Sequence, residues 1–374
     1  MPERRTLRLA VIPGDGIGPE VTAAAAQALA AVARRFGHTF ELRTFPIGGV
    51  AMRQGSMPLP ADTLSACRQA DAILLGAVGD PAFDRNDPDR RPEAGILGLR
   101  RELGLYANLR PARVYPGLEE AGPLKRSVVE GVDLLIVREL TGGLYYGTPR
   151  GVTPDGGSAY NTLTYSRVEV ERIAVRAFEE ARRRTRRLIS VDKANVLETS
   201  RLWREVVEKV GQRFPDVTLN HMYVDNCAMQ LVREPARFDV IVTENMFGDI
   251  LSDEAGAVVG SLGLLPSASL GDGPGLFEPV HGSAPDLAGR DQANPIGALA
   301  SAAMLLRYAL RLNDEADAVD EAIGETLISG LRTADLVGAA QKGAGPEKSA
   351  AVSCSAMAGA IVDRLRSVNS ISTL

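Results

Sequence analysis

Two aspartates four residues apart are the strongest chemical signal in this sequence of 374 residues. Asp249 and Asp253 follow a short apolar run that ends at Thr243, and their spacing places both carboxylates on one face of an expected helix. Because like charges at this spacing repel each other, we expect a positive group between them. Carboxylate oxygens are typical ligands of Mg²⁺ or Mn²⁺, and Asp225 could supply a third. Helix N-terminal preference for acidic residues is the alternative, and it accounts for Asp249 alone.

Three arginines, Arg100, Arg110 and Arg138, could bind the carboxylates of a substrate. Arg138 follows an apolar run at the point where α/β sheets place their ligands. Guanidinium groups bind carboxylates through two parallel hydrogen bonds, so three of them would suit a diacid. For Arg100 or Arg110 taken alone, a surface or ion-paired arginine is the favoured interpretation.

Lys193 also ends an apolar run, which covers Leu188–Val191. Near another cation, such a lysine is a candidate general base. A lysine whose stem is buried and whose ammonium reaches water explains the pattern equally well. The motif alone leaves both interpretations open.

Two glycine-rich segments could contact a nucleotide. Gly14–Glu20 lies between an apolar run and a helical pattern, as a dinucleotide-binding fingerprint would. However, its glycine spacing differs from that fingerprint, and Asp15 and Glu20 place negative charge where a pyrophosphate would approach. The second segment, Gly271–Gly289, contains His281, and a loop this rich in Gly and Pro favours ligand contact. We therefore expect a nucleotide site that is not a conventional Rossmann fold.

Alternating apolar runs and helical patterns predict an α/β fold with a largely parallel sheet. At this length two lobes are expected. The turn signal at Pro154–Gly157 predicts a β-hairpin that needs a packing partner, such as a second subunit. The expected strands are Leu7–Ile12, Ala72–Leu75, Leu134–Val137, Leu188–Val191 and Val240–Thr243, with helices over Glu20–Arg35 and Arg167–Arg184.

Composition argues against several other classes of protein. The formal net charge is −5, which does not favour a nucleic-acid binder, and the basic run Arg182–Arg187 is expected to be a solvated helix end. No apolar run is long enough to span a membrane. Three scattered cysteines and an N-terminus, Met1–Arg5, that leads directly into a strand predict a cytoplasmic protein with reduced thiols.

Together these motifs resemble the β-decarboxylating dehydrogenase family, which includes isopropylmalate, isocitrate, homoisocitrate and tartrate dehydrogenases. The similarity runs from Leu9 to about Leu336. The segment Arg138–Gly147 is similar to the isopropylmalate branch, whereas isocitrate and tartrate branches typically read Arg-Glu-Asn-Thr-Glu-Gly. The resemblance implies a two-domain fold of the isocitrate/isopropylmalate dehydrogenase type with a mixed sheet. Its first domain, residues 1–105 and 260–374, would bind NAD; its second, 106–259, would carry the substrate and metal residues and a dimerisation arm at about 143–165.

The resemblance also implies roles for individual residues. The substrate carboxylates would be held by the three arginines, and one Mg²⁺ or Mn²⁺ per active site by Asp225, Asp249 and Asp253. Catalysis would rest on Lys193 as the proton acceptor, Tyr145 as a proton donor, and Asp225. The remaining residues implied are Glu93, Ile96, Leu97 and Val196 around an isopropyl group, and Ile12, Glu278, His281, Gly282, Ser283, Ala284, Pro285, Asp286 and Asn294 around NAD.

The implied activity is NAD-dependent oxidation and decarboxylation of 3-isopropylmalate in leucine biosynthesis. Asp286 resembles the NAD form of the family, because a carboxylate there accepts ribose hydroxyls and repels a 2′-phosphate. Lys193 and Asp225 would enter the site from the partner subunit of a homodimer. Three alternatives stay open: a sister-branch enzyme acting on D-malate, tartrate or homoisocitrate, a nucleotide-binding protein without catalysis, and a structural dimer joined by the arm.

Overall fold

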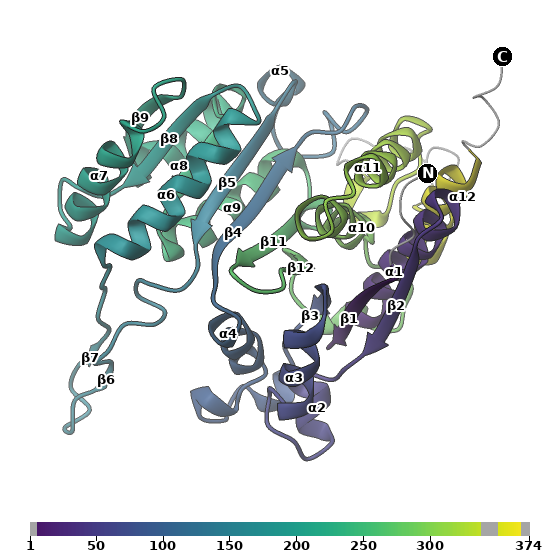
Figure 1. Ribbon diagram of the computed structural model, residues 1–374, viewed down its shortest axis with the longest axis horizontal. Helices are drawn as coiled ribbons and strands as arrows, with labels where there is room; N and C mark the ends of the chain where they lie inside the picture. The colour runs from purple at the N-terminus through teal and green to yellow at the C-terminus, as the bar shows by residue number, and fades with distance from the viewer. Residues whose placement is uncertain (1–5, 338–350, 368–374) are drawn as a thin grey trace. The chain divides into compact units, whose positions relative to one another are not determined.

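The chain forms two compact units. A computed structural model describes residues 6–337 and 351–367 (Figure 1), so Met1–Arg5 and most of the tail beyond Leu336 lie outside the described residues. Unit 1 consists of Met1–Leu105, Tyr115–Pro123 and Gly260–Leu374. Unit 2 consists of Tyr106–Val114 and Leu124–Val259. Each unit has its own strands and its own covering helices.

In unit 1 the strands lie in the order β2-β1-β3-β12-β11. The first three pairings are parallel, and β11 runs antiparallel to β12. Helices α1, α10, α11 and α12 pack with this sheet or with one another, and α2, α3 and α4 follow β2 and β3 in sequence. The bounds are β1 Thr6–Gly14, β2 Thr39–Thr44, β3 Ala72–Ala77, β11 Pro266–Gly271 and β12 Leu276–Pro279, with α1 Gly18–Phe36, α2 Gly48–Arg53, α3 Ala61–Gln69, α4 Glu93–Glu102, α10 Ile296–Met304, α11 Asn313–Ile328 and α12 Cys354–Ser367.

The core of unit 1 follows from apolar patterning. Every residue of β3 is buried, as expected for a parallel strand covered on both faces. Helix α1 buries a stripe of mostly small residues at helical spacing, which lets α10 and α12 pack against it. The helix is followed by Gly37, whose φ of 81° is the left-handed conformation that glycine adopts at low cost.

In unit 2 the strands lie in the order β4-β5-β10-β8-β9. Only β4 runs antiparallel to its neighbour within this set. Figure 1 shows α6 and α7 on one face of these strands and α8 and α9 on the other. The bounds are β4 Leu105–Arg113, β5 Asp133–Glu139, β8 Arg187–Asp192, β9 Thr218–Tyr223 and β10 Val240–Thr243, with α5 Arg126–Val129, α6 Arg167–Arg182, α7 Glu198–Gly211, α8 Val224–Arg233 and α9 Asn245–Val259.

The five strands expected from the sequence are confirmed as β1, β3, β5, β8 and β10. The expected hairpin is present but short, since β6 (Gly151–Val152) and β7 (Ala159–Tyr160) pair over two residues each and are exposed. The sequence did not indicate β2 or β4. Strand β2 is largely exposed, and β4 contains Pro111, so neither shows the apolar run of a buried strand.

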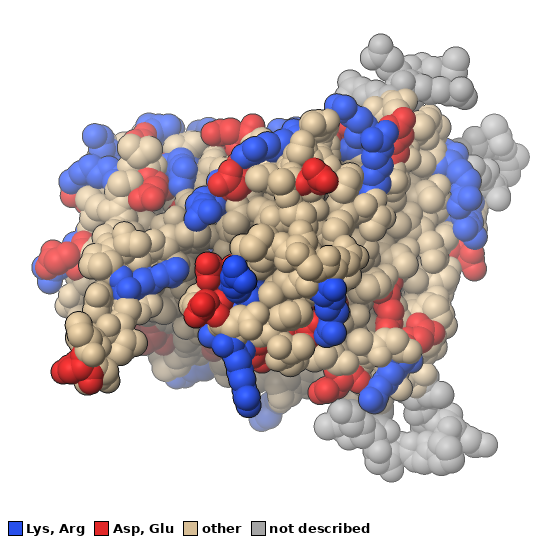
Figure 2. All heavy atoms as spheres, turned by 90° about the horizontal axis from the view of Figure 1, so that it is seen from below, with Lys and Arg blue, Asp and Glu red and all other residues tan. Residues whose placement is uncertain are grey.

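Charged residues are paired more extensively than the sequence suggested. The basic run is a largely exposed helix end, as expected, since α6 ends at Arg182. Arg182, Arg183 and Arg184 also form ion pairs with Asp216, Glu180 and Asp239. Acidic and basic side chains are interspersed on the face drawn in Figure 2. The three cysteines are free and buried, as expected. Among the described residues, no helix is long and apolar enough to cross a membrane.

Candidate active site

Three side chains of unit 2 converge on the carboxylate of Asp249, in the second turn of α9. Arg138 donates from Nη1 to Asp249 Oδ1, and Arg110 Nη1 lies 3.4 Å from the same oxygen. The hydroxyl of Tyr145 donates to Oδ2 at 2.9 Å. Arg110 and Arg138 are 7% and 3% exposed, so Asp249 offsets part of their charge with little help from water, and Asp253 lies 3.8 Å from Arg110 as a second anion.

The backbone explains how these groups meet. Arg138 stands opposite Thr243, the last residue of β10, and α9 begins two residues later at Asn245. A Cβ at Gly248 would lie 2.6 Å from Cγ of Arg138, so only glycine lets the helix lie against the arginine stem. Arg138 therefore reaches its position because β5 and α9 approach closely at the carboxyl end of the parallel strands. Arg110 comes from β4, the antiparallel neighbour of β5.

Asp253 is the more open member of the aspartate pair. Its side chain is 61% exposed, and its Oδ1 lies 3.8 Å from Arg110 Nη1. Partial desolvation of the carboxyl group by its neighbours, together with the nearby Asp249, raises the pKa of Asp253 above its usual value. The positive group expected between the two aspartates is thus Arg110 in this chain. The donor set still fits a hard divalent cation, because two carboxylates share one helix face and one of them is open to solvent.

Lys193 and Asp225 form a separate pair in unit 2. Lys193 follows β8, Asp225 lies in the first turn of α8, and Nζ of the lysine contacts Oδ1 of the aspartate. The hydrogen bond from Lys193 lowers the pKa of Asp225. In the described part of the chain the two residues pair with each other, and neither is bonded to Asp249 or Asp253. One chain therefore does not bring the three expected metal ligands together.

In unit 1 the four site residues expected around the isopropyl group and one carboxylate share a helix. Glu93, Ile96, Leu97 and Arg100 are spaced three or four apart on α4, so they lie on one face, while Gly95 and Leu99 are buried. Arg100 donates to Glu278 at 2.8 Å. Val196, the fifth residue of this expected set, belongs to unit 2 and is 62% exposed.

The turn after β1 is held by hydrogen bonds between the side chain of Asp15 and backbone amides. The carboxylate of Asp15 accepts hydrogen bonds from the amides of Gly49, Val50 and Gly79 at 2.8–2.9 Å. Asp15 therefore joins this turn to α2 and to the segment after β3, and it keeps a carboxylate beside the turn, where it would oppose a pyrophosphate. Ile12, two residues before the end of the same strand, is fully buried.

The second glycine-rich loop packs against that turn. The amide of Ile17 donates to the carbonyl of Ser283 at 2.8 Å, and a Cβ at Gly16 would lie 1.9 Å from the same oxygen. Gly16 has a φ of 56°, so glycine is required both by conformation and by contact. Of the neighbouring residues expected to bind NAD, Gly282, Pro285 and Asp286 are exposed and Ala284 is partly exposed.

His281 carries an orphaned buried atom that fits a ligand. Its Nδ1 lies 3.0 Å from the carbonyl oxygen of Gly282, while Nε2 is buried without a partner among the described residues. Burial lowers the pKa of His281, so the ring is neutral and Nε2 is a bare acceptor. A nucleobase amine would satisfy it. Asn294, by contrast, accepts from the amide of Ile296 at 3.0 Å and donates to Asp335 at 3.0 Å.

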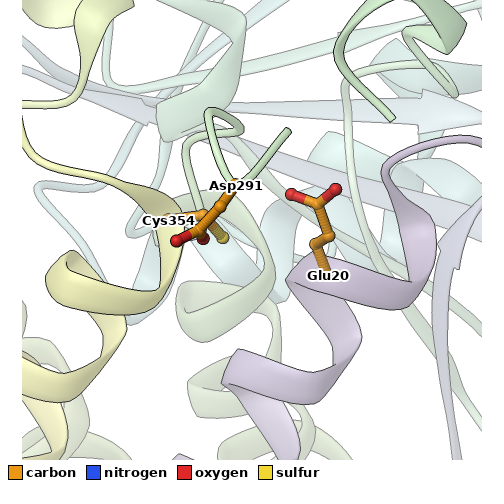
Figure 3. Close-up of side chains that lie close together, drawn as sticks. All are labelled: Glu20, Asp291 and Cys354. Atoms are coloured by element: carbon orange, nitrogen blue, oxygen red, sulfur yellow. The ribbon is translucent and has the colours of Figure 1, made fainter. Parts of the chain in front are cut away.

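A further group of potential ligands lies in unit 1, outside the expected sites. Glu20, Asp291 and Cys354 place their ligand atoms within 4.8 Å of one another (Figure 3), and they form the one such trio found among residues 6–337 and 351–367. Both carboxylates already accept hydrogen bonds, Glu20 from the amide of Gly289 and Asp291 from Ser355. Burial raises the pKa of the Cys354 thiol to about 12. These contacts link α1 to α12 through the loop that carries Gly289 and Asp291, and Oε2 of Glu20 is buried without a hydrogen-bond partner among the described residues.

Comparison with known proteins now places the chain. The family model described as isocitrate/isopropylmalate dehydrogenase matches residues 8–361. The chain belongs to this family. It is 59% identical over 332 residues to the 3-isopropylmalate dehydrogenase of Geobacillus kaustophilus, covering 88% of this chain and 90% of that protein. It is 54% identical over 331 residues to that of Aquifex aeolicus, covering 88% and 91%. The crystal structure of isocitrate dehydrogenase from Methylococcus capsulatus superposes with a TM-score of 0.83 at 35% identity, covering 96% and 99%.

Family membership explains the mixed sheet, and it does not by itself explain how the site is held together. Asn108 and Asn245 were not predicted from the sequence as site residues. They are 0% and 1% exposed, and they accept hydrogen bonds from Arg110 and Arg138. A signal was present, because Asn108 precedes Arg110 by two residues on a strand and so shares its face. Asn245 lies four residues before Asp249, on the same face of the helix.

Proposed function

We propose that this chain oxidises and decarboxylates 3-isopropylmalate to 4-methyl-2-oxopentanoate and CO₂ with NAD⁺, a reaction of leucine biosynthesis. The observation that carries the proposal is the convergence of Arg110, Arg138 and Tyr145 on Asp249, beside the open carboxylate of Asp253. Two nearly buried guanidinium groups beside two carboxylates suit a substrate that brings both an anion and a metal. The similarity to 3-isopropylmalate dehydrogenases supports the choice of diacid.

In this proposal each substrate group has a partner of matching chemistry. Arg110 and Arg138 bind one carboxylate, and Arg100 binds the other by exchanging its partner Glu278 for the substrate. Ile96 and Leu97 contact the isopropyl group, and Val196 contributes a further apolar surface. Glu93 lies on the same face of α4 as Ile96 and Leu97, so it limits how far a larger or more anionic side group could extend.

The metal and NAD⁺ are proposed cofactors. Asp249 and Asp253 would hold one Mg²⁺ or Mn²⁺, with Asp225 as the third protein ligand. The bound cation would supply Lewis-acid stabilisation of the negative charge that develops on oxygen. NAD⁺ would accept the hydride. The loop of His281–Asp286 would hold it, and Ile12, Glu278 and Asn294 would lie around it.

Side chains of this protein would move the protons. Lys193 accepts the proton of the substrate hydroxyl, directly or through a water molecule, while a hydride leaves the carbon that carries this hydroxyl. Tyr145 stays protonated, because its pKa is raised to about 12 by burial and by Asp249, so it can donate to the carbon from which CO₂ leaves. Asp249 fixes the hydroxyl of Tyr145 for this transfer.

The active site is proposed to be shared between the subunits of a homodimer. Lys193 and Asp225 pair with each other and not with the aspartates of their own α9, which supports their entering the partner's site. Helices α8 and α9 pack together and expose apolar side chains suited to a subunit interface. These side chains are Met229, Val232 and Ile250, which are 46%, 42% and 59% exposed.

Subunit mixing tests the shared site. Lys193→Ala and Asp249→Asn homodimers should each be nearly inactive, and mixing them after mild dissociation should restore activity in the hybrid dimers. Hybrid formation is checked by native mass spectrometry. Hybrids that form but stay inactive would show that Lys193 and Asp249 act within one chain.

The catalytic proposal is tested by NADH formation with four diacids. We expect turnover of 3-isopropylmalate that requires Mn²⁺ or Mg²⁺, and much weaker turnover of D-malate, tartrate and homoisocitrate. NADP⁺ should be a poor acceptor, because Asp286 would repel its 2′-phosphate. Preference for any other diacid would place the chain in a sister branch, and no turnover of any would reject the proposal. The cytoplasmic location stays a prediction from the sequence.

A further inference from the structure

Both nearly buried arginines of unit 2 are held by buried asparagines. Arg110 donates from Nε to Oδ1 of Asn108 at 2.8 Å. Arg138 donates from Nε and Nη2 to Oδ1 of Asn245 at 3.0 and 2.7 Å. An edge of each guanidinium therefore meets a neutral amide oxygen, while Nη1 of each points to the carboxylate of Asp249.

The amide of Asn245 is itself fixed in one orientation. Its Nδ2 donates to the carbonyl of Gly142 at 3.2 Å, so Oδ1 must face Arg138. Its backbone amide donates to the hydroxyl of Tyr165 at 3.0 Å, and that hydroxyl lies 3.3 Å from Oε2 of Glu244. Asn245, the first residue of α9, is thus held through its side chain by Gly142 and through its backbone by Tyr165.

Close packing leaves this network little freedom to move. A Cβ at Gly142 or Gly143 would lie 2.6 Å from the ring or the hydroxyl of Tyr165. On its other side Tyr165 meets Trp203 edge to face, with ring centroids 5.7 Å apart. Tyr165 is 9% exposed, and Asn245 is 1% exposed. Displacing the asparagine amide would therefore require the surrounding side chains to move as well.

The neutrality of the amide matters for the charge of Arg138. This arginine already faces one carboxylate, Asp249, and a second one at position 245 would cancel the charge needed for a substrate anion. An amide oxygen orients the guanidinium through the same two hydrogen bonds without adding negative charge. Because a misdirected guanidinium loses two-pronged binding of a carboxylate, orientation contributes directly to substrate affinity.

We propose that Asn245 is a positioning residue for substrate binding, which holds one edge of Arg138 so that the other meets the substrate carboxylate beside Asp249. The proposal rests on the proposed function, since it assumes an anionic substrate at Arg138. Asn245 acts only through the arginine. Its removal should therefore affect the KM for the diacid more than kcat, and leave the KM for NAD⁺ unchanged.

The test is a double-mutant comparison in the full-length enzyme with 3-isopropylmalate as the diacid. In the wild-type background, Asn245→Ala should raise the KM for the diacid about tenfold, the loss expected when a charged hydrogen bond is removed. In the Arg138→Lys background, where no Nε is present to be held, Asn245→Ala should change the same constant by less than about twofold. Equal factors in both backgrounds would overturn the proposal. Asn220→Ala, an exposed asparagine on β9, is the matched control and should change neither constant.

Further readouts separate positioning from general destabilisation. If Asn245→Ala does not fold, the isosteric Asn245→Asp replaces it, and this variant should raise the KM for the diacid more strongly because it cancels the charge of Arg138. An unchanged KM in a folded Asn245→Asp protein would contradict the proposal. So would parallel losses in kcat, both KM values and melting temperature. If the wild-type protein turns over no diacid, the proposed function itself fails, and that result is distinct from a missing coupling between Asn245 and Arg138.

Discussion

The two units place their expected site residues in different ways. In unit 2 polar and charged side chains converge: Arg110, Arg138 and Tyr145 reach one carboxylate, and buried asparagines hold the arginines. In unit 1 the corresponding segments are held by backbone, as in the hydrogen bond from the amide of Ile17 to the carbonyl of Ser283. Substitutions at these side chains of unit 2 should therefore change chemistry or substrate affinity, and substitutions at the loop glycines of unit 1 should change loop shape and stability.

Lys193→Ala gives the largest expected effect. Removing the proton acceptor should lower kcat about a thousandfold, because general-base catalysis typically contributes about 10²–10⁴. The fold should be retained, since the ammonium is bonded only to the exposed Asp225 among the described side chains. Steady-state kinetics and circular dichroism measure the two quantities. Lys209→Ala, an exposed lysine on α7, is the control, and near-normal turnover of Lys193→Ala would remove the assigned role.

Asp253→Asn tests the metal site with a smaller effect. We expect the Mn²⁺ concentration for half-maximal activity to rise about 10–100-fold, the range seen when groups that support a metal site are changed. Stability should hardly fall, because the side chain is 61% exposed. The measurements are a Mn²⁺ titration of activity and thermal melting. An unchanged titration would argue against a cation at Asp253, and Asp314→Asn on α11 should leave it unchanged in any case.

The same contrast explains what the sequence could predict. The buried strands, and the shared helix face of Asp249 and Asp253, could be predicted from the sequence, because apolar runs and helical periodicity are local properties. The positive partner of that pair was not, because Arg110 lies on a strand far away in the sequence. A repelling pair indicates that a cation is needed, but it does not distinguish a metal ion from an arginine.

Backbone-built sites were harder still to anticipate. The sequence argued against a conventional pyrophosphate turn at Gly14–Gly18, but it did not show that Asp15 binds two amides at the start of α2 and one after β3. Nor did it show that Asn294, expected near NAD, accepts a hydrogen bond from the amide of Ile296 and donates one to Asp335. Such roles depend on which loops approach each other, and no local pattern encodes that approach.

Two glycine substitutions sharpen the comparison within unit 1. Gly37→Ala should cost about 1–2 kcal/mol of unfolding free energy, because φ is 81° and a Cβ there would meet nothing within 4 Å. Gly16→Ala carries a similar conformational cost and adds a collision with the carbonyl of Ser283, so it should cost more. Urea unfolding measures both. Gly16→Ala should also raise the KM for NAD⁺ while sparing that for the diacid, and equal effects of the two substitutions would show that loop contact is unimportant.

Tyr145→Phe gives the smallest expected effect on stability, and it tests how far the side chains of unit 2 are coupled. Burial and Asp249 raise the pKa of Tyr145 to about 12 in the folded protein, above the ordinary tyrosine value of 10.0. The folded state therefore retains a proton that the unfolded chain loses, so stability from this group is complete below pH 10 and is lost as the pH rises to about 12. Phenylalanine removes that loss, and urea midpoints of the two proteins should converge across this interval.

At neutral pH the phenol is protonated, so the basic limb of the wild-type rate profile should not arise from Tyr145. A limb that disappears in Tyr145→Phe would show that the tyrosine ionises during turnover.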